Sequence, residues 1–395
     1  MNVYADNAAT TRMSQAAVDA MLPFLRESYG NPSSLYTLGQ KAAESLQASR
    51  ETMAKYLGCD AREITFTSGG SEADNQALLT AATLGARKGK KHIISTAFEH
   101  HAILHSLKRL EKQGFEVTLL DVHENGLVTA QQVADAIRED TCLVTVMYAN
   151  NEIGTIQPIA EIGAVCRERG VLFHTDAVQA AGHLPINVRE QNIDMLSLSA
   201  HKFHGPKGVG LLYARKGIFL TNLIEGGAQE RGKRAGTENV GGIAGMAAAF
   251  REACEHMDEN ITKVTALRDK LIDGLSKIPH CALNGDREHR LPGNVNFCFE
   301  GIEGESMLLL LDGKGICASS GSACTSGSLD PSHVLLAIGR PHEVAHGSLR
   351  LTLCESNTEA EIDHILACVP EIVAYLRGMS PVWRDLVEGK KSFIL

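Results

Sequence analysis

The sequence predicts an α/β protein whose core is a seven-stranded, mainly parallel sheet with helices on both faces. From about residue 40, helical patterns alternate with short β-branched runs, which is typical of helices that cover a parallel sheet. Several helical patterns stop just before a glycine, as a helix C-terminus favours. The chain has 395 residues, enough for a large core and a second, smaller domain.

The strand candidates are short apolar or β-branched runs. Seven of them lie in the first part of the chain, at residues 64–67, 92–95, 117–120, 143–148, 171–174, 195–199 and 210–213. Helical patterns lie between or before them, at residues 42–57, 101–112 and 159–169, and Gly58, Gly114 and Gly170 follow these three. This alternation predicts the helix-covered sheet.

After about residue 255 the alternation stops. We expect a helix, a strand, a helix, a strand and a closing helix, at residues 261–277, 294–299, 305–311, 349–352 and 359–377. The sequence therefore predicts a large domain at residues 15–255. Residues 1–14 and 256–395 are expected to form a smaller α+β domain.

Composition excludes several classes of protein. The 38 Lys and Arg against 47 Asp and Glu give a net charge of −9 without a long run of either sign, so a nucleic-acid partner is not expected. No apolar run reaches the roughly 18 to 20 residues that cross a bilayer, and the first residues lack a signal-peptide pattern. We expect a cytoplasmic protein. Its ten cysteines are scattered singly, which predicts neither a disulfide framework nor a zinc ribbon.

A lysine and an aspartate follow two of the predicted strands. Lys202 comes after the strand at 195–199, and a lysine that is desolvated there can form a Schiff base. Asp176 comes after the strand at 171–174, where a carboxylate can hold the pyridine nitrogen of pyridoxal phosphate. A lysine and an aspartate are the least that a protein supplies to this cofactor. The alternatives are a solvated loop lysine and a strand-end aspartate that caps a turn.

A metal site is the rival interpretation of the same segment. His174 and Asp176, together with His201 or His204, could form a facial triad for non-haem iron. Such sites usually occur in antiparallel barrels, so the alternating pattern of this chain disfavours them.

Other candidate residues follow further strands. Residues 67–72, including Gly70 and Ser71, join a strand to a helix and predict a phosphate cradle, or alternatively a simple helix cap. His100 offers an imidazole that could stack on a cofactor and move protons near neutral pH. The amide of Asn151 could bond a phenolic oxygen. Cys324 lies in a Ser/Gly-rich run at residues 319–328, which indicates a thiol on a mobile arm.

Together these motifs resemble the cysteine desulfurases of the NifS/IscS type, which are class V, fold type I enzymes dependent on pyridoxal 5'-phosphate. The resemblance runs over nearly the whole chain and rests on residues 6–11, 30–34, 99–100, 149–152, 174–179, 199–202, 234–239 and 319–328. The long Ser/Gly loop is similar to that of the first group of the family, whose cysteine is mobile.

The resemblance implies a role for each motif. Lys202 would bind the cofactor covalently and Asp176 would hold its ring nitrogen. The other implied cofactor contacts are Gln179 and Asn151 near the ring hydroxyl, His100 on the ring, Gly70, Ser71, Ser199, Ala200 and His201 around the phosphate, and Thr237 reaching the phosphate of the neighbouring subunit. Arg350, with Asn151, would bind the substrate carboxylate, and Cys324 would receive the sulfur.

The implied reaction removes sulfur from L-cysteine and leaves L-alanine and a persulfide on Cys324. Lys202 would take the α-proton and His100 would help to deprotonate the thiol. The resemblance further implies a homodimer and an iron-sulfur scaffold protein as sulfur acceptor. Selenocysteine lyase or another β-lyase that uses the same cofactor is the alternative, and a catalytically silent partner of a sulfur scaffold is a third hypothesis.

The chain departs from the family pattern in a few places. Ser71 stands where threonine is usual, which keeps the hydroxyl, and Ala228 stands where histidine is frequent. The tail from residue 380 resembles the end that related enzymes offer to a scaffold, but its last dozen residues match no family pattern.

Overall fold

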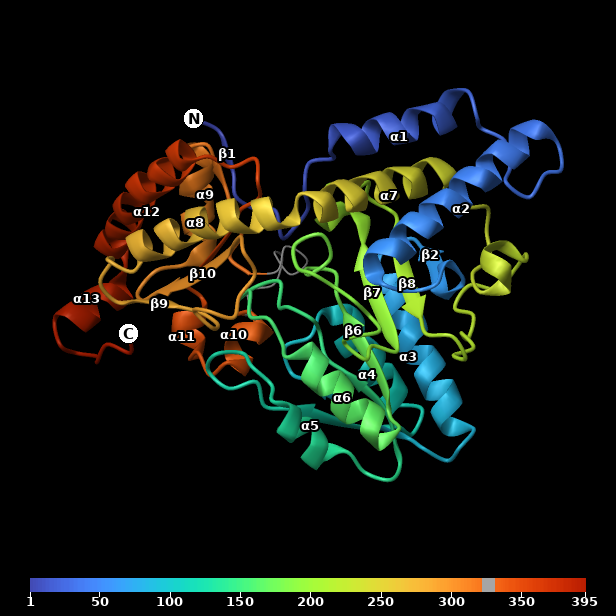
Figure 1. The fold of residues 1–395 in the computed structure, drawn as a ribbon. Coiled ribbons are helices and arrows are strands. Elements are labelled where there is room, and N and C mark those ends of the chain that lie inside the picture. Colours follow the sequence, from blue (N-terminus) through green and yellow to red (C-terminus); the bar gives the residue numbers. More distant parts are fainter. Residues whose placement is uncertain (322–330) are drawn as a thin grey trace.

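A central seven-stranded sheet forms the larger part of the fold (Figure 1), and the computed structural model describes residues 1–321 and 331–395. In spatial order the strands are β2 (Ile64–Thr67), β8 (Gly210–Ala214), β7 (Met195–Ser199), β6 (Leu172–Asp176), β5 (Thr141–Thr145), β3 (His92–Thr96) and β4 (Glu116–Leu120). Strand β8 runs antiparallel to both neighbours, and the other pairs are parallel. The predicted mainly parallel sheet is confirmed.

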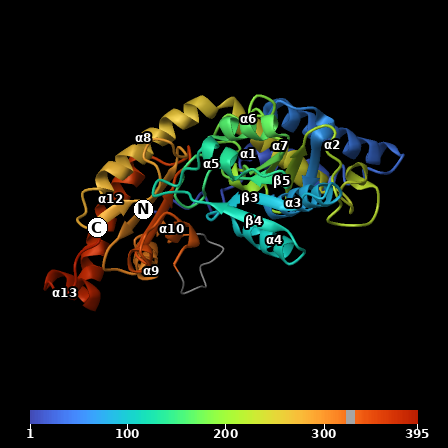
Figure 2. The same ribbon diagram turned by 90° about the horizontal axis from the view of Figure 1, so that it is seen from below.

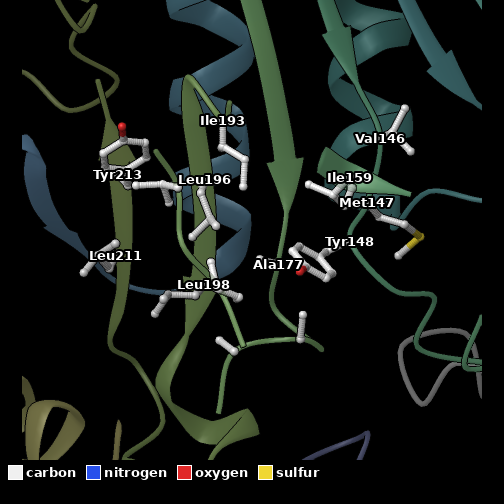
Figure 3. Close-up of a cluster of buried hydrophobic side chains, with 14 of the residues drawn as sticks. Val146, Met147, Tyr148, Ile159, Ala177, Ile193, Leu196, Leu198, Leu211 and Tyr213 are labelled. Atoms are coloured by element: carbon white, nitrogen blue, oxygen red, sulfur yellow. The ribbon is translucent and has the colours of Figure 1, made fainter. Parts of the chain in front are cut away.

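Helices cover both faces of this sheet. One face packs against α3 (Gly70–Ala86) and α4 (His101–Glu111), and the other against α2 (Thr37–Leu57), α5 (Ala130–Ala136), α6 (Ile159–Arg169) and α7 (Val240–Glu255). Consecutive strand residues divide between the two cores: Ile93 packs with the first set and Ile94 with the second. This is the two-residue period of a strand buried on both sides. Figure 3 shows part of the second core, with Leu196, Leu198 and Tyr213 side by side.

Several predicted boundaries differ from the observed ones by a few residues. The run at 143–148 is a strand only to Thr145, although Val146, Met147 and Tyr148 are all buried. A buried loop and a buried strand are equally apolar, so composition does not separate them. The helix that begins at His101 ends at Glu111, and the glycine with positive φ (+85°), Gly114, follows the helix cap at Lys112 by two residues.

A second, antiparallel sheet lies beside the first (Figure 2). Its order is β12 (Ser348–Thr352), β10 (Asn294–Phe299) and β9 (Cys281–Leu283), and α8 (Met257–Leu275), α9 (Gly304–Gly313) and α12 (Glu359–Met379) pack with it around a separate apolar core. The N-terminal strand β1 (Val3–Tyr4) pairs with β11 (Ile316–Cys317) in the same region. Both ends of the chain therefore contribute to the apolar core of the second sheet.

The remaining elements connect the two sheets. Helix α7 is followed almost directly by α8, so the pair runs along both sheets (Figure 1). Helix α1 (Gln15–Arg26) packs on α7. Helices α10 (His333–Ala337) and α11 (His342–Ala345) place Val334, Leu335 and Val344 in the core of the seven-stranded sheet. Three short 3₁₀ turns are η1 (Ala61–Glu63), η2 (Ala200–Lys202) and η3 (Gln229–Gly232).

The C-terminal tail folds back onto the second sheet. After α13 (Pro381–Val387), the ring of Phe393 stacks on His280 with centroids 3.7 Å apart, and both carboxylate oxygens of Glu300 accept backbone N–H groups of the last two residues. No single described helix is long and apolar enough to cross a membrane; α12 and α13 meet that test only as a pair bent by 86°. One face of α12 is buried in the core of the second sheet.

Candidate active site

A cavity of about 530 Å³ lies at the carboxyl ends of the parallel strands, where α/β proteins usually bind ligands. We call it the active-site pocket. It is lined by most of the residues that the sequence singled out: Gly70, Ser71, His100, Asn151, Asp176, Gln179, Ser199, His201, Lys202 and Arg350. Ala200 is buried beneath the pocket rather than lining it, and Thr237 is exposed elsewhere. Cys324 lies outside the described residues.

Lys202 is held at the end of η2, directly after β7. Its ammonium Nζ donates hydrogen bonds to the carbonyl oxygens of Ala8 (2.6 Å) and Ala9 (2.8 Å). Its own carbonyl oxygen accepts a hydrogen bond from Nε2 of the half-buried His183 (2.9 Å). The N-terminal segment therefore lies against the lysine side chain while His183 holds its backbone. Sequence reasoning missed His183 because no strand end or motif marks it.

Three buried carboxyl groups, Asp176, Asp74 and Glu99, lie in or next to the pocket. Asp176 is 5% exposed, and its Oδ1 accepts a hydrogen bond from the backbone N–H of Val178 (2.9 Å). Burial raises the pKa of Asp176, while His100 and Lys202 act in the opposite direction. Burial and the nearby Asp176 also raise the pKa of Asp74. A cationic ring beside Asp176 would favour its ionised form.

Glu99 and Asp74 are the two carboxyl groups of this set to which the sequence analysis gave no role. Burial raises the pKa of Glu99 to about 8 against the hydrogen bonds that its Oε1 accepts from Met147 and Thr96. Asp74 lies one helical turn after Gly70 in α3, and that spacing is the sequence signal that could have found it.

The iron-triad alternative is not supported. His174 is fully buried, and its two ring nitrogens bond to Thr145 Oγ1 (2.9 Å) and Ser197 Oγ (3.0 Å). Burial lowers the pKa of His174 to about 3, so the ring is neutral and acts as a structural link between strands. Among the described residues, the one group with metal-ligand spacing contains neither His174 nor Asp176.

The backbone fixes the protonation of His100. Its Nδ1 accepts a hydrogen bond from the backbone N–H of Ala102 (3.1 Å), which caps α4. A nitrogen that accepts this bond carries no proton, so the neutral ring is protonated on Nε2. His100 thus has a fixed tautomer and a defined atom for proton transfer.

The predicted phosphate cradle lies at the N-terminus of α3. Gly69 has a φ of +155°, and a Cβ on Gly70 would lie only 2.6 Å from Val178 Cγ2. A side chain at position 70 would therefore collide with Val178. Glycine at this position lets backbone N–H groups approach a ligand closely. Across the pocket, His201 is held through its Nδ1 by Thr10 Oγ1 (3.1 Å). Burial, and then Lys202, lowers its pKa to about 4, so that ring is neutral.

Arg350 is almost fully buried, with 1% exposure, and reaches the pocket from β12. Its Nη2 donates to Asp6 Oδ1 (2.9 Å) and its Nη1 donates to the carbonyl oxygen of Asn151 (3.2 Å), while Nε has no hydrogen-bond partner. A buried guanidinium with an unpaired donor is suited to bind a carboxylate. It connects the second sheet to the strand ends of the first.

The residues that flank the predicted sulfur-acceptor loop are fixed to the same pocket. On the N-terminal side, Ser319 exchanges two backbone hydrogen bonds with Arg350 (3.1 and 2.6 Å). On the C-terminal side, the hydroxyl of Ser332 donates a short hydrogen bond to Oε2 of Glu152, which is 1% exposed. Glu152 follows Asn151 directly. Both flanks are therefore attached to segments that carry pocket residues, and the sequence analysis did not assign this role to Glu152.

The segment that carries Thr237 is held by two ion pairs. Arg50 and Glu230 form a buried, doubly hydrogen-bonded pair (2.7 and 2.8 Å), and Glu230 and Arg231 both have positive φ. Arg234 pairs with Glu72 in the first turn of α3 (2.9 and 3.2 Å). The exposed Thr237 thus lies on a loop that is attached next to the phosphate cradle.

Comparison with known proteins gives consistent matches over nearly the full chain. A family model described as aminotransferase class-V matches residues 3–365. Cysteine desulfurase IscS of Clostridium botulinum is 54% identical over 393 residues, covering 99% of both chains. Cysteine desulfurase IscS of Methanosarcina thermophila is 54% identical over 380 residues, covering 96% of this chain and 94% of the relative.

Solved structures share the fold. A NifS-like protein superposes with a TM-score of 0.89 at 40% identity, covering 95% of this chain and all of its own. A structure of SspA in complex with cysteine superposes with a TM-score of 0.79 at 36% identity, covering 89% of this chain and 99% of that one.

Proposed function

The chain belongs to the class-V aminotransferase family, as its motifs predicted, and we propose that it is a cysteine desulfurase that uses pyridoxal 5'-phosphate. The observation that carries the proposal is the pocket that brings Lys202, Asp176, His100 and Arg350 together. The reaction would convert L-cysteine and an enzyme thiol to L-alanine and an enzyme persulfide. The sulfur atom changes partner, and no external oxidant is needed.

The residues present fit this cofactor. The glycine cradle at α3 and the neutral His201 suit a phosphate, the buried Asp176 suits a ring nitrogen, and Lys202 supplies the amine. Gln179, Asn151 and Ser199 line the same pocket and complete the proposed set, with Ala200 beneath. When bound, the cofactor supplies an electron sink that makes the α-carbon of an amino acid acidic.

The chain's own groups then have distinct tasks. Arg350 would bind the substrate carboxylate and so orient the amino acid, with Asn151 beside it. Nζ of Lys202 would accept the α-proton. Nε2 of His100, the nitrogen that carries the ring proton, would exchange a proton with the attacking thiol. We assign that thiol to Cys324 on the resemblance, because Cys324 lies outside the described residues.

The flanking hydrogen bonds support this assignment of the thiol. Ser319 is paired with Arg350, and Ser332 with Glu152. The described residues on either side of 322–330 are thus bonded to the proposed substrate-binding residue and to the neighbour of Asn151. This contact pattern is independent of the sequence motif.

We also propose a homodimer in which Thr237 completes the phosphate site of the second subunit. Thr237 is exposed, its loop is held by Arg234, and Phe219 (81% exposed) and Leu35 (90% exposed) are large apolar side chains in contact with water. Sedimentation should show dimers, and Thr237→Ala should weaken cofactor binding without a change in that state. A fully active monomer would contradict the dimer.

The same proposal includes the domain organisation, the sulfur acceptor and the cellular compartment. We propose a large cofactor-binding domain at 15–255 and a small domain from residues 1–14 and 256–395. An iron-sulfur scaffold protein is proposed as the sulfur acceptor, in line with the IscS names of the relatives. The nine described cysteines are free thiols, which suits a reducing cytoplasm.

Product analysis tests the proposal. The purified enzyme, given L-cysteine and a thiol reductant, should release L-alanine and sulfide in equal amounts. A β-lyase would instead give pyruvate and ammonia, and a silent partner would give neither. Comparison of kcat/KM for L-selenocysteine and L-cysteine then decides between a selenocysteine lyase and a desulfurase.

A further inference from the structure

A second cavity, of about 890 Å³, lies on the other side of the turn that carries Lys202. We call it the rear cavity. It is bounded by residues 10–15, by the junction of α7 and α8, by His183 and by residues 353–356 after β12. The proposed reaction uses none of its side chains directly, so its chemistry requires a separate explanation.

Three different metal-binding side chains meet at its edge. They are the imidazole of His204, the thiol of Cys354 and the carboxylate of Glu355, and one ligand atom from each lies within 4.8 Å of the others. His204 is two residues after Lys202, and the other two follow β12. Cys354 is 5% exposed.

The imidazole is oriented as metal ligands usually are. Nδ1 of His204 donates to the carbonyl oxygen of Arg12 (2.9 Å), and its backbone N–H and C=O are bonded to Thr11 Oγ1 (2.8 Å) and Ser14 N (2.9 Å). This leaves Nε2 with its lone pair in the neutral ring. Nε2 faces Oε1 of Glu355 at 3.1 Å, so two of the three ligand atoms already lie next to each other.

The backbone conformation of His204 also determines which way its imidazole points. His204 has a φ of +64°, a conformation that side chains other than glycine rarely adopt. It turns the imidazole into the rear cavity while Lys202 lines the active-site pocket. The left-handed backbone is therefore what separates the two side chains.

The other two groups lie next to the imidazole. Oε1 of Glu355 is 3.1 Å from Nε2 of His204. The thiol of Cys354 lies 3.0 Å from the hydroxyl of Ser356, and its backbone N–H donates to Asn357 Oδ1 (2.9 Å). Three donors of nitrogen, sulfur and oxygen thus converge at one edge of the rear cavity.

The geometry points to a binding site for a divalent transition metal, of which Zn²⁺ is the expected occupant, at His204, Cys354 and Glu355. A thiolate and an imidazole select a borderline-soft metal over Mg²⁺ or Ca²⁺. Three protein ligands leave a fourth position open toward the rear cavity for water. Binding would release the thiol proton of Cys354, and any proton on Nε2 of His204, to solvent.

Such an ion would join two parts of the active site from behind. One ligand belongs to the turn of Lys202, and the other two lie four and five residues after Arg350 in the chain. A bound metal would therefore fix the separation between the lysine and the guanidinium. The inference does not depend on the reaction that the active-site pocket performs.

The test uses the dimeric enzyme with its cofactor after removal of metals by a chelator. Elemental analysis after incubation with Zn²⁺ should give one ion per chain, and Co²⁺ should produce the visible bands of a thiolate-bound tetrahedral ion. Cys354→Ala and His204→Asn should lower the affinity by more than the roughly ten- to hundredfold that loss of an outer-shell partner costs. Asparagine is chosen because it tolerates positive φ.

Matched variants separate this site from other thiols and from misfolding. Cys317→Ala removes an exposed thiol, and Cys324→Ser removes the proposed sulfur acceptor. Both should still bind one ion per chain. Glu355→Gln keeps the shape of a half-exposed side chain and should weaken binding while the cofactor spectrum is retained. Absence of a bound ion in the parent enzyme, binding unaffected by Cys354→Ala, or binding lost in Cys324→Ser would overturn the proposal.

Discussion

The active-site pocket and the rear cavity share one turn of the chain and differ in their chemistry. Lys202 faces the pocket together with Asp176, His100 and Arg350, which are groups suited to the proposed anionic, carbonyl-bearing cofactor and an amino acid. His204 faces the rear cavity together with a thiol and a carboxylate. Because His204 has a positive φ, the side chains of Lys202 and His204 face different cavities although they belong to one turn.

The two cavities also differ in volume and in their position in the fold. The rear cavity is the larger, at about 890 Å³ against about 530 Å³ for the pocket. Of the two cavities, only the pocket lies at the carboxyl ends of the parallel strands and contains a buried carboxylate beside a lysine. Position in the fold and donor type, rather than volume, therefore identify the reactive site.

Replacement of Lys202 has the largest expected effect on the active-site pocket. Lys202→Ala should lower turnover of L-cysteine by about a thousandfold or more, because alanine has no amine to bind the cofactor or take the α-proton. Borohydride reduction followed by peptide mapping should fix the cofactor on Lys202 in the parent enzyme and in Lys207→Ala. Lys207 lines the same pocket and is thus a matched control. An adduct on Lys207 would refute the assignment.

Arg350→Lys tests the substrate side of the pocket. Lysine keeps the charge but cannot form the planar, two-bonded contact to a carboxylate. We expect KM for L-cysteine to rise by roughly ten- to hundredfold, the loss of one hydrogen bond to a charged group, with a smaller change in kcat. Steady-state kinetics measure both, and the absorbance of the cofactor reports that the site is intact. An unchanged KM would remove Arg350 from substrate binding.

Glu152→Gln tests the attachment of the acceptor loop. The charged acceptor of the Ser332 hydroxyl is lost, so persulfide formation should slow by about tenfold, the equivalent of one hydrogen bond. Cofactor binding should not change. Ser332→Ala should have a similar effect, and the double variant should add little, because the two residues share one contact. Additive effects would show that they act separately.

Glu99→Gln leaves the proposed reacting groups in place and concerns stability. The pKa of Glu99 is about 8 in the folded chain, against about 4.3 when unfolded. Between these values the folded state holds one proton more. Its free energy of unfolding therefore falls as the pH rises through this window and levels off above it. Urea unfolding of the cofactor-free enzyme should show this fall in the parent and less of it in Glu99→Gln. Identical pH profiles would contradict the raised pKa.

The sequence predicted the sheet and most of the pocket because strand ends and glycine turns are local signals. β2 and β7 match their predicted bounds, and the residues that follow β6 and β7 line the pocket as expected. The long connection that brings Arg350 to Asp6 is not a local signal. The resemblance to a family assigned Arg350 to the substrate, but its ion pair with Asp6 was not predicted.

What the sequence did not predict depends on tertiary contacts. Glu152 acquires its role from Ser332, which lies 180 positions away in the chain. His204 was considered only as a ligand for iron beside Asp176, because its positive φ, which turns it to the opposite side, has no signature in the residue types around it. His183 and Asp74 likewise become significant through burial next to Lys202 and Asp176.

The central claim is that the pocket delivers sulfur from L-cysteine to Cys324. The most direct measurement is mass spectrometry of the enzyme after exposure to L-cysteine and a trapping reagent, compared between the parent, Cys324→Ser and the matched Cys317→Ser. We predict one additional sulfur on the peptide that contains Cys324, with L-alanine formed, in the parent and in Cys317→Ser. Cys324→Ser should show neither, because a serine hydroxyl is hardly ionised near neutral pH. A persulfide on Cys317 or Cys354, or undiminished alanine from Cys324→Ser, would contradict the account.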